Sequence, residues 1–127
     1  MPAPTRPRRS VLYMPGSNPR ALEKARGLPA DGLIFDLEDA VTPDAKAAAR
    51  DAVAASVAAG GYGKRELFLR VNALATPWGY ADLEAAARIG VDAVLLPKVE
   101  SADAVRQAAS ILAALGAPDQ LAIWCMM

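Results

Sequence analysis

An apolar segment followed by a capped helical segment recurs along the chain, about once every 20–35 residues. Asn18-Pro19 and Thr42-Pro43 are typical helix starts, because a polar cap precedes a proline that fits the first helical turn. Glycines follow the helical segments and end them. The expected strands are 11–14, one within 32–41, 66–71, 93–97 and 121–127. This alternation predicts an α/β fold with a parallel sheet.

The stretch 32–41, GLIFDLEDAV, begins as an apolar run and ends in an acidic cluster. Alternate side chains of a strand point to opposite faces. The two expected faces are Ile34, Asp36 and Glu38 on one side and Leu33, Phe35 and Leu37 on the other. An apolar strand that ends in carboxylates predicts a polar site at the carboxyl edge of a parallel sheet. The alternative is that Asp36 and Asp39 only cap the following loop.

The next two predicted strands also become polar at their C-terminal ends. Their polar faces are expected to be Phe68, Arg70 and Asn72 in one strand and Leu96, Lys98 and Glu100 in the other. Charge in such positions is costly unless it is paired or used. Three neighbouring strands in register therefore predict one convergent polar site. An internal ion-pair network, such as Arg70 with Asp36 or Glu38, is the alternative interpretation.

Composition limits the partners and the chemistry. Lys and Arg total 14 and balance 14 Asp and Glu, which favours neither nucleic acid nor a membrane surface as a partner. No apolar run is long enough to span a bilayer, and residues 1–9 are basic and proline-rich without a signal-peptide core. We therefore expect a flexible tail at 1–9 on a cytoplasmic protein. Cys125 is the only cysteine, and the sequence contains no histidine, the commonest general base.

The predicted site combines an arginine with carboxylates. Arg70 at a strand end suits bidentate capture of a carboxylate. Asp36 and Glu38 suit a hard divalent cation, bound directly or through water. A cation beside such an arginine fits a 2-oxo acid, whose carboxylate and carbonyl can chelate metal, and it would stabilise developing enolate or alkoxide charge. These residue types point to making or breaking a carbon–carbon bond next to a carbonyl.

Five ordered motifs carry a family resemblance. They are RSVLYMPGSN at 9–18, FDLEDAV at 35–41 with Lys46 and Arg50 after it, RVN at 70–72, TPWG at 76–79 and LPKVE at 96–100. Together they resemble the citrate lyase beta subunit and malyl-CoA lyase family of the HpcH/HpaI aldolase superfamily of TIM barrels. The resemblance implies a magnesium-dependent lyase that acts on a 3-hydroxyacyl-CoA such as citryl-CoA or malyl-CoA. Its products would be acetyl-CoA and a 2-oxo acid, or it would catalyse the reverse condensation.

The resemblance also implies roles for individual residues. Arg70 would bind the carboxylate of the oxo acid, Tyr13 would lie near substrate, and Lys24 would face the CoA phosphates. Ordinary alternatives are a core aromatic for Tyr13 and a solvated helix residue for Lys24. Asp36 and Glu38 would act on magnesium through its water ligands.

Two further positions bear on the resemblance. Lys98 and Glu100 are additional site candidates. Asn18 stands where related malyl-CoA lyases have a basic residue, which leaves the subtype open.

The family places a metal-binding glutamate just after the fifth strand and an aspartate on the next strand, whereas this sequence stops at Met127. The resemblance thus implies that residues 10–127 form the N-terminal part, about (βα)4β, of a (β/α)8 barrel. The direct magnesium ligands would then follow Met127. We expect this chain alone to be inactive, and the longer parent to bind acyl-CoA and oxo acid and to form a homo-oligomer.

Three alternatives remain open at the level of the sequence. An HpaI-type metal-dependent aldolase uses a histidine base, for which the chain has no candidate. An open, doubly wound sheet that binds a nucleotide is another, although the turn PGSNP at 15–19 has neither phosphate-binding glycine pattern. The third is a non-catalytic subunit or paralogue that serves as a scaffold.

Overall fold

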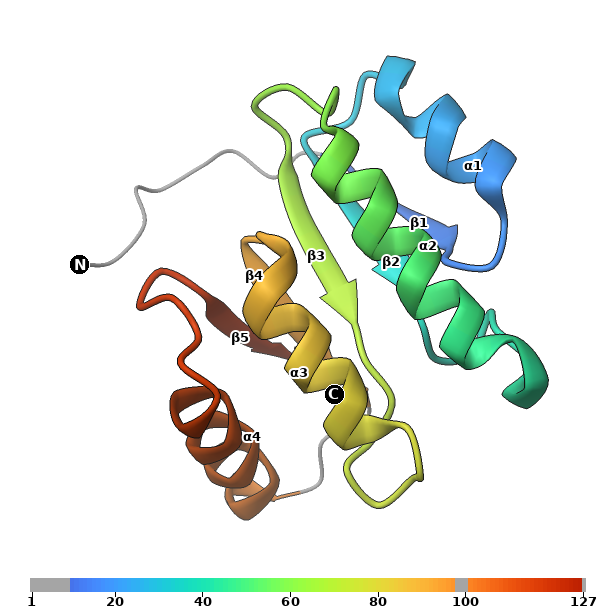
Figure 1. The fold of residues 1–127 in the computed structure, drawn as a ribbon. Helices are drawn as coiled ribbons and strands as arrows, with labels where there is room; N and C mark the ends of the chain where they lie inside the picture. The colour runs from blue at the N-terminus through green and yellow to red at the C-terminus, as the bar shows by residue number, and fades with distance from the viewer. Residues whose placement is uncertain (1–9, 98–100, 127) are drawn as a thin grey trace.

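The computed structural model describes residues 10–97 and 101–126, so the predicted tail and the candidates Lys98 and Glu100 lie outside the described residues. Its five strands form one parallel sheet in the order β1-β2-β3-β4-β5 (Figure 1). The strands are β1 (Val11–Pro15), β2 (Gly32–Asp36), β3 (Glu66–Arg70), β4 (Ala93–Leu96) and β5 (Ala122–Cys125). The helices are α1 (Pro19–Lys24), α2 (Lys46–Ala59), α3 (Gly79–Ile89) and α4 (Ala102–Ala114), with 3-10 turns η1 (Ala25–Gly27) and η2 (Pro43–Ala45).

The helix boundaries follow local chemistry. The side chain of Asn18 accepts hydrogen bonds from two backbone N–H groups in the first turn of α1, and Ser101 caps α4 in the same way. Gly60 and Gly90 end α2 and α3 with positive φ angles, which glycine adopts without strain. Thr42 makes no capping bond through its side chain, since the turn η2 comes between it and α2. The predicted cap at Thr42 is therefore wrong in detail.

All four α-helices cover one face of the sheet, with α2 against α1 and α3, and α3 against α4 (Figure 1). Parallel strands that follow one another in space as in sequence, with crossovers of one hand, place every helix on the same side. A doubly wound sheet would instead reverse its strand order and carry helices on both faces. The observed order is the predicted (βα)4β arrangement and excludes the doubly wound alternative for the described residues.

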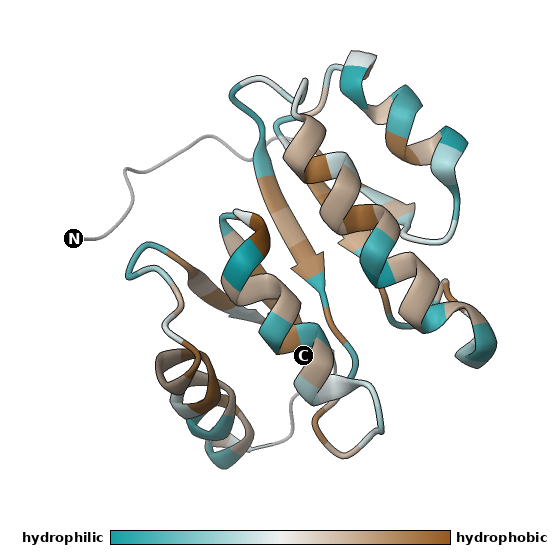
Figure 2. Ribbon diagram, in the orientation of Figure 1, coloured by the Kyte–Doolittle hydropathy of each residue, from teal (hydrophilic) through white to brown (hydrophobic). Residues whose placement is uncertain are grey.

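The core lies between the sheet and these helices. Four helix-facing residues of β2, β3 and β4 have no exposed area, namely Leu33, Phe35, Leu69 and Val94. The middle of β3 is hydrophobic, whereas the loop that leads into it is hydrophilic (Figure 2). None of the described helices has the length and apolar character needed to cross a bilayer. Most of the hydrophobic driving force is therefore expected at this single sheet–helix interface.

The opposite face of the sheet is a shallow apolar hollow. It is lined by Val11, Tyr13, Ile34, Phe68, Leu95, Trp124 and Met126. The rings of Phe68 and Trp124 meet edge to face with centroids 5.2 Å apart. Tyr13 is 49% exposed and Trp124 37% exposed. In a closed barrel this would be the inner face, so the side chains that alternate with the core residues are the ones that could meet a ligand there.

The fourth strand departs from the sequence prediction. Parallel pairing sets Arg70 beside Leu95, and Leu95 packs with Ile34 on the open face. Leu96 consequently belongs to the helix-covered core. The prediction that the face of Leu96 continues the polar face of the two preceding strands is wrong, because the register shifts its parity by one residue.

Gly79 provides a test of the packing at the start of α3. A Cβ atom added there would lie 2.7 Å from Cα of Leu74 and would also overlap the carbonyl of Ala73. We expect Gly79→Ala to lower the free energy of unfolding by about 1–3 kcal/mol, since the overlap outweighs the gain in helix propensity. Urea denaturation measures this. Gly27→Ala is the control, because its Cβ meets nothing within 4 Å, and an equal loss in both variants would contradict the packing.

Candidate active site

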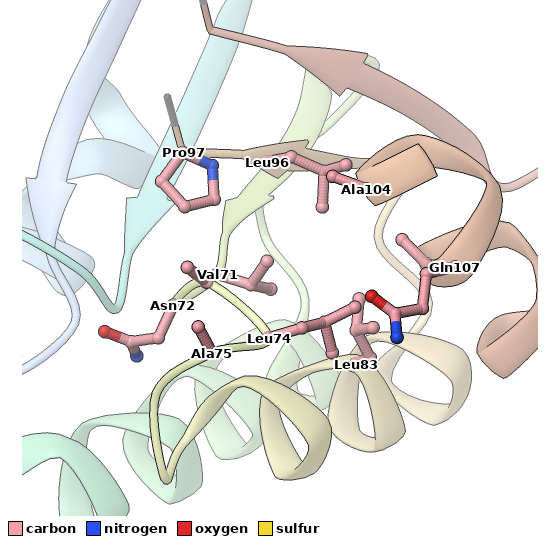
Figure 3. Close-up of a pocket in the computed structure, with 11 residues that line it drawn as sticks. Val71, Asn72, Leu74, Ala75, Leu83, Leu96, Pro97, Ala104 and Gln107 are labelled. Atoms are coloured by element: carbon pink, nitrogen blue, oxygen red, sulfur yellow. The ribbon is translucent and has the colours of Figure 1, made fainter. Parts of the chain in front are cut away.

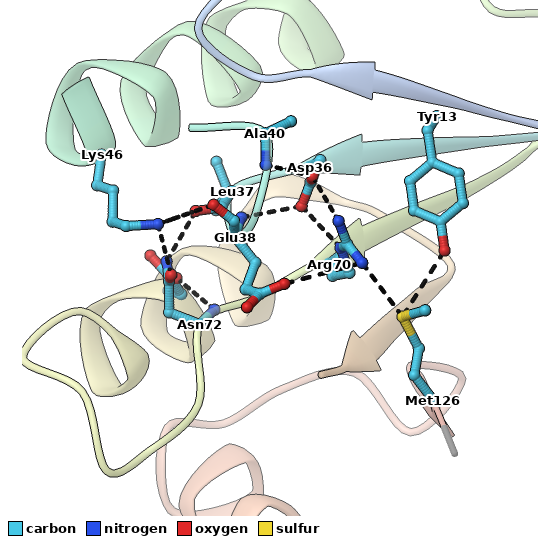
Figure 4. Close-up of polar contacts among 10 residues, drawn as sticks. Tyr13, Asp36, Leu37, Glu38, Ala40, Lys46, Arg70, Asn72 and Met126 are labelled. Atoms are coloured by element: carbon cyan, nitrogen blue, oxygen red, sulfur yellow. Dashed lines mark hydrogen bonds and ion pairs between the residues drawn. The ribbon is translucent and has the colours of Figure 1, made fainter. Parts of the chain in front are cut away.

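The site is organised by an ion pair between the last residues of two neighbouring strands. Asp36 ends β2, Arg70 ends β3, and the strand register sets them side by side. Nε of Arg70 donates to Oδ1 of Asp36 at 2.8 Å, and Nη2 donates to Oδ2 at 2.7 Å (Figure 4). The geometry is bidentate, and the side chain of Asp36 is only 2% exposed and that of Arg70 12% exposed.

The carboxylate of Asp36 also organises the loop after β2. The backbone N–H of Glu38 donates to Oδ1 at 2.9 Å, and that of Ala40 donates to Oδ2 at 3.1 Å. Burial by itself raises the pKa of Asp36, but the hydrogen bonds from Arg70, Glu38 and Ala40 outweigh it and hold that pKa below its ordinary value. Asp36 is therefore an anion saturated with N–H donors.

Arg70 has further partners that fix its guanidinium plane. The ring of Tyr13 lies under it, with 4.9 Å from Cζ to the ring centroid. Nη1 donates to Sδ of Met126 at 3.4 Å and lies 3.8 Å from Oε1 of Glu38. The hydrogen bond to Asp36 raises the pKa of Arg70 above its ordinary value, although burial opposes this. Arg70 is thus a permanently charged donor held in one orientation.

The guanidinium keeps donor capacity on the side away from Asp36. A guanidinium has five N–H groups, of which Asp36 takes one on Nε and one on Nη2. Met126 offers only a weakly accepting thioether sulfur to Nη1. The pair faces an open basin lined by Tyr13, Asp36, Asp39, Ala40, Arg70 and Met126. The ion pair foreseen as an alternative is therefore present, and Nη1 has Glu38 as a looser ionic partner at 3.8 Å. The second N–H of Nη2 and the N–H of Nη1 that is not directed at Met126 remain for an anionic ligand.

A second polar group lies beside this pair, between the loops after β2 and β3. Lys46, at the start of α2, is buried, and its Nζ donates to three oxygens (Figure 4). These are the carbonyls of Leu37 at 3.1 Å and Glu38 at 2.9 Å, and Oδ1 of Asn72 at 2.8 Å. Nζ also lies 5.1 Å from the centroid of the Trp78 ring. The buried ammonium of Lys46 thus links the loop after β2 to the loop after β3.

Asn72 links Lys46 to the buried carboxylate of Asp82. Its Nδ2 donates to the carbonyl of Leu37 at 2.9 Å and to Oδ2 of Asp82 at 2.6 Å. Its backbone N–H donates to the same Oδ2 at 2.9 Å. Nε of Arg50 donates to Oδ1 of Asp82 at 3.0 Å, so both carboxylate oxygens of Asp82 are hydrogen-bonded. The side-chain orientation of Asn72 follows from its partners, because Lys46 needs an acceptor and Asp82 needs a donor.

The structure brings together four of the five residues predicted for the site, namely Tyr13, Asp36, Glu38 and Arg70. Tyr13 is exposed at the basin and is not a core aromatic. Lys24 is exposed at the far end of α1, and the structure does not place it with the other four. Its contact with CoA phosphates remains a prediction.

Four participants are not predicted as site residues from the sequence, namely Asp82, Lys46, Arg50 and Met126. Asp82 sits in the first turn of α3, where an acidic residue looks like an ordinary partner of the helix dipole. Lys46 and Arg50 were noted only as parts of a motif. Met126 follows β5 in a run of apolar residues, and only its spatial position beside Arg70 reveals it. The one sequence signal for Lys46 is its place after the FDLEDAV motif, because the burial of a lysine cannot be seen in the sequence.

The described residues offer a divalent cation little by themselves. No group of three or more His, Cys, Asp or Glu side chains within residues 10–97 and 101–126 gathers closely enough to hold a metal. The oxygens of Asp36 are engaged by Arg70 and backbone N–H groups. Glu38 is 28% exposed in its side chain and retains acceptor capacity. The donor set therefore fits a contact through metal-bound water, with direct ligands supplied from elsewhere.

A second hollow lies between the loop after β3, α3 and α4 (Figure 3). Its volume is about 220 Å³, and its lining is mostly apolar, with Leu74, Leu83 and Leu96 among the larger side chains. Asn72 and Gln107 are the polar side chains on its wall. It contains none of the ionic groups around Arg70, so the chemistry is assigned to the basin.

Comparison with protein-family models assigns residues 9–117 to HpcH/HpaI aldolase/citrate lyase. The chain belongs to this family. It is 50% identical over 121 residues to a (3S)-malyl-CoA thioesterase of Cereibacter sphaeroides, a match that covers 95% of this chain and 40% of that protein. It is 45% identical over 101 residues to the citrate lyase subunit beta of Escherichia coli, which covers 80% of this chain and 33% of the subunit. The chain thus spans at most about two fifths of the length of these curated relatives, which are enzymes.

Solved structures agree on the fold. The protein CitE of Mycobacterium tuberculosis, in complex with magnesium, acetoacetate and coenzyme A, superposes with a TM-score of 0.67 at 29% identity, covering 93% of this chain and 49% of that one. A Haloferax volcanii malate synthase superposes with a TM-score of 0.78 at 19% identity, covering 92% of this chain and 40% of that one, which bears on the fold alone. The sheet is therefore part of a TIM-barrel-type fold, as the sequence predicted.

The lowered pKa of Asp36 predicts an acid-sensitive contribution to stability. Its folded-state pKa lies below the unfolded value of about 3.9. The contribution is complete above that unfolded pKa and is lost as pH falls through the folded one. We expect the free energy of unfolding of Asp36→Asn to fall less steeply below about pH 4 than that of the parent protein. Denaturation over a pH series measures this, with Asp44→Asn, at an exposed carboxylate, as the control for the substitution itself. Identical slopes for parent and Asp36→Asn would contradict the assignment.

Proposed function

We propose that the complete protein containing this chain is a magnesium-dependent carbon–carbon lyase. Its substrate would be a 3-hydroxyacyl-CoA such as citryl-CoA or malyl-CoA, which it cleaves to acetyl-CoA and a 2-oxo acid or forms from them. Membership of the family supports a reaction on a CoA ester. This chain would contribute part of the site, with the remainder supplied by the rest of a closed barrel.

The proposal is supported mainly by the two edges of the Arg70 guanidinium: one binds Asp36, and the other stays available to a ligand. Asp36 holds one edge of the guanidinium rigidly and neutralises part of its charge, so a permanent cation can be kept at a largely buried strand end. The remaining N–H groups face the basin and match the spacing of carboxylate oxygens. A 2-oxo acid would place its carboxylate there and its carbonyl farther along the basin.

Tyr13 and Met126 shape the place where the carboxylate would lie. The Tyr13 ring stacks against the guanidinium and prevents it from swinging away from the plane set by Asp36. Its hydroxyl donates to Sδ of Met126 at 3.7 Å, a weak hydrogen bond that a carboxylate could replace at little cost. The basin is therefore organised before an anion arrives, which favours binding because little ordering remains to be done.

Magnesium belongs to the proposal through Glu38. Relatives crystallised with magnesium include the Mycobacterium tuberculosis CitE protein. A bound magnesium ion would supply Lewis-acid polarisation of the carbonyl and stabilise developing oxyanion charge. Glu38 would accept hydrogen bonds from water on that ion, while its loop is held by Asp36 and Lys46. Asp36 would keep Arg70 oriented during the reaction.

A second candidate function is hydrolysis of the thioester. The relatives with 48–50% identity carry the name (3S)-malyl-CoA thioesterase. Both reactions need an anchor for the acid end of a malyl-type substrate, and Arg70 serves either. The two differ in the bond that breaks, namely a carbon–carbon bond in the lyase and the carbon–sulfur bond in the thioesterase.

Substitution of Arg70 tests the carboxylate anchor. Arg70→Ala in the complete protein should raise the KM for the oxo acid in the condensation direction by about tenfold to a hundredfold, because charge-assisted hydrogen bonds are lost. Arg70→Lys should recover only part of this, since an ammonium lacks the planar fork. Arg88→Ala, at an exposed side chain, is the control. Steady-state kinetics decide the matter, and a scaffold without catalytic function would show no turnover to lose.

Product analysis separates the lyase from the thioesterase. Incubation of the complete protein with malyl-CoA and magnesium should release glyoxylate, trapped as its phenylhydrazone, together with acetyl-CoA. Release of free CoA thiol and malate without glyoxylate would establish the thioesterase instead. If neither citryl-CoA nor malyl-CoA is cleaved by either route, the proposed function is wrong.

A further inference from the structure

Lys46 has an unusual set of partners for a buried lysine. Its three hydrogen-bond acceptors are two backbone carbonyl oxygens and the side-chain oxygen of Asn72, all of them uncharged. A buried ammonium is costly unless its protons are satisfied, and here each of three protons has an acceptor. The nearest compensating charge in this network, Asp82, is reached only through Asn72. Such an arrangement is poorly suited to giving stability alone.

The atoms that Lys46 holds belong to the segment that carries Glu38. The backbone N–H of Glu38 is fixed by Asp36, and its carbonyl is fixed by Lys46. The residue before it, Leu37, donates its N–H to the carbonyl of Arg70 at 2.9 Å and offers its own carbonyl to Lys46 and Asn72. The peptide groups before and after Cα of Glu38 are therefore both held by hydrogen bonds. This fixes the position of Cα, from which the carboxylate of Glu38 extends.

The outer end of the network reaches the helices. Asp82 on α3 accepts from Asn72 through one oxygen and from Arg50 on α2 through the other. Asp82 has no exposed area, whereas the side chain of Arg50 is 19% exposed. The orientation of Asn72, and with it the third acceptor of Lys46, thus depends on a contact between two helices.

We propose that Lys46 is a positioning residue for the site. Lys46, oriented by Asn72, Asp82 and Arg50, sets the backbone from which the Glu38 side chain approaches Arg70, which lines the basin. The inference deepens the proposed function and rests on it for its kinetic consequence, while its structural consequence is independent. Groups that orient a metal-facing carboxylate commonly change metal affinity or activity by about 10- to 100-fold when they are removed.

Lys46→Met tests this, since methionine fills a similar volume without the ammonium. Hydrogen exchange of the complete protein should show the amides of Glu38 and Ala40 exchanging about tenfold faster or more. The amide of Leu69, within β3, should change little. In the same variant kcat should fall by about 10- to 100-fold, and the magnesium concentration for half-maximal activity should rise. Lys46→Arg should restore part of both, because it keeps a charged donor.

Val53→Ala is the matched control for a general loss of stability. Val53 lies on α2, is fully buried, and belongs to the apolar core away from the polar network. This variant should accelerate exchange across the core together and leave kcat near the parent value below its melting temperature. If Lys46→Met resembles Val53→Ala in both readouts, Lys46 is merely structural and the proposal is overturned.

Arg50→Met covers the case in which Lys46→Met does not fold. It removes only the outer contact with Asp82 and should produce the same local changes at Glu38 and Ala40 in weaker form. No local change in Arg50→Met would count against the network. Faster local exchange in these variants, combined with normal oxo-acid kinetics in Arg70→Ala, would uphold the positioning network while refuting the proposed function.

Discussion

The described structure depends on the match between two neighbouring strand ends, where Asp36 and Arg70 meet in a bidentate pair. Either charge alone would be costly at so buried a position. Together they neutralise each other at the carboxyl ends of β2 and β3, and Asp36 orders the loop after β2 through two backbone N–H groups. Part of the guanidinium stays available to a ligand. One interaction therefore serves both the fold and the predicted chemistry, which is why its two halves cannot be exchanged independently.

Successive side chains of a strand point to opposite faces, and this alternation separates the residues of the core from those of the candidate site. Leu33 and Phe35 face the helices, whereas on the other side of the sheet Ile34 faces the hollow and Asp36 faces the basin. The hydrophobic pattern fixes this choice, because a slip by one residue would expose the whole core side. The lysine network at the start of α2 adds a third task, since it ties the loops after β2 and β3 to the helices.

Much of this organisation was predictable from local patterns. The strands, the cap at Asn18 and the meeting of Arg70 with Asp36 follow from local sequence patterns and from parallel strands ending at one edge. The face of β4 was not predictable, because register is a relation between strands. The role of Asp82 depends on how α3 packs against α2, a tertiary contact that no short sequence window contains.

The alternation of faces has a practical meaning for altering the protein. Ile34, Phe68 and Leu95 line the hollow without contributing to the helix-packed cluster. Their side chains could therefore be substituted to change the volume and polarity of the hollow. The hydrophobic core between the sheet and the helices would be left intact. The properties of the hollow and the stability of the fold could then be altered almost independently. The Asp36–Arg70 pair would affect both.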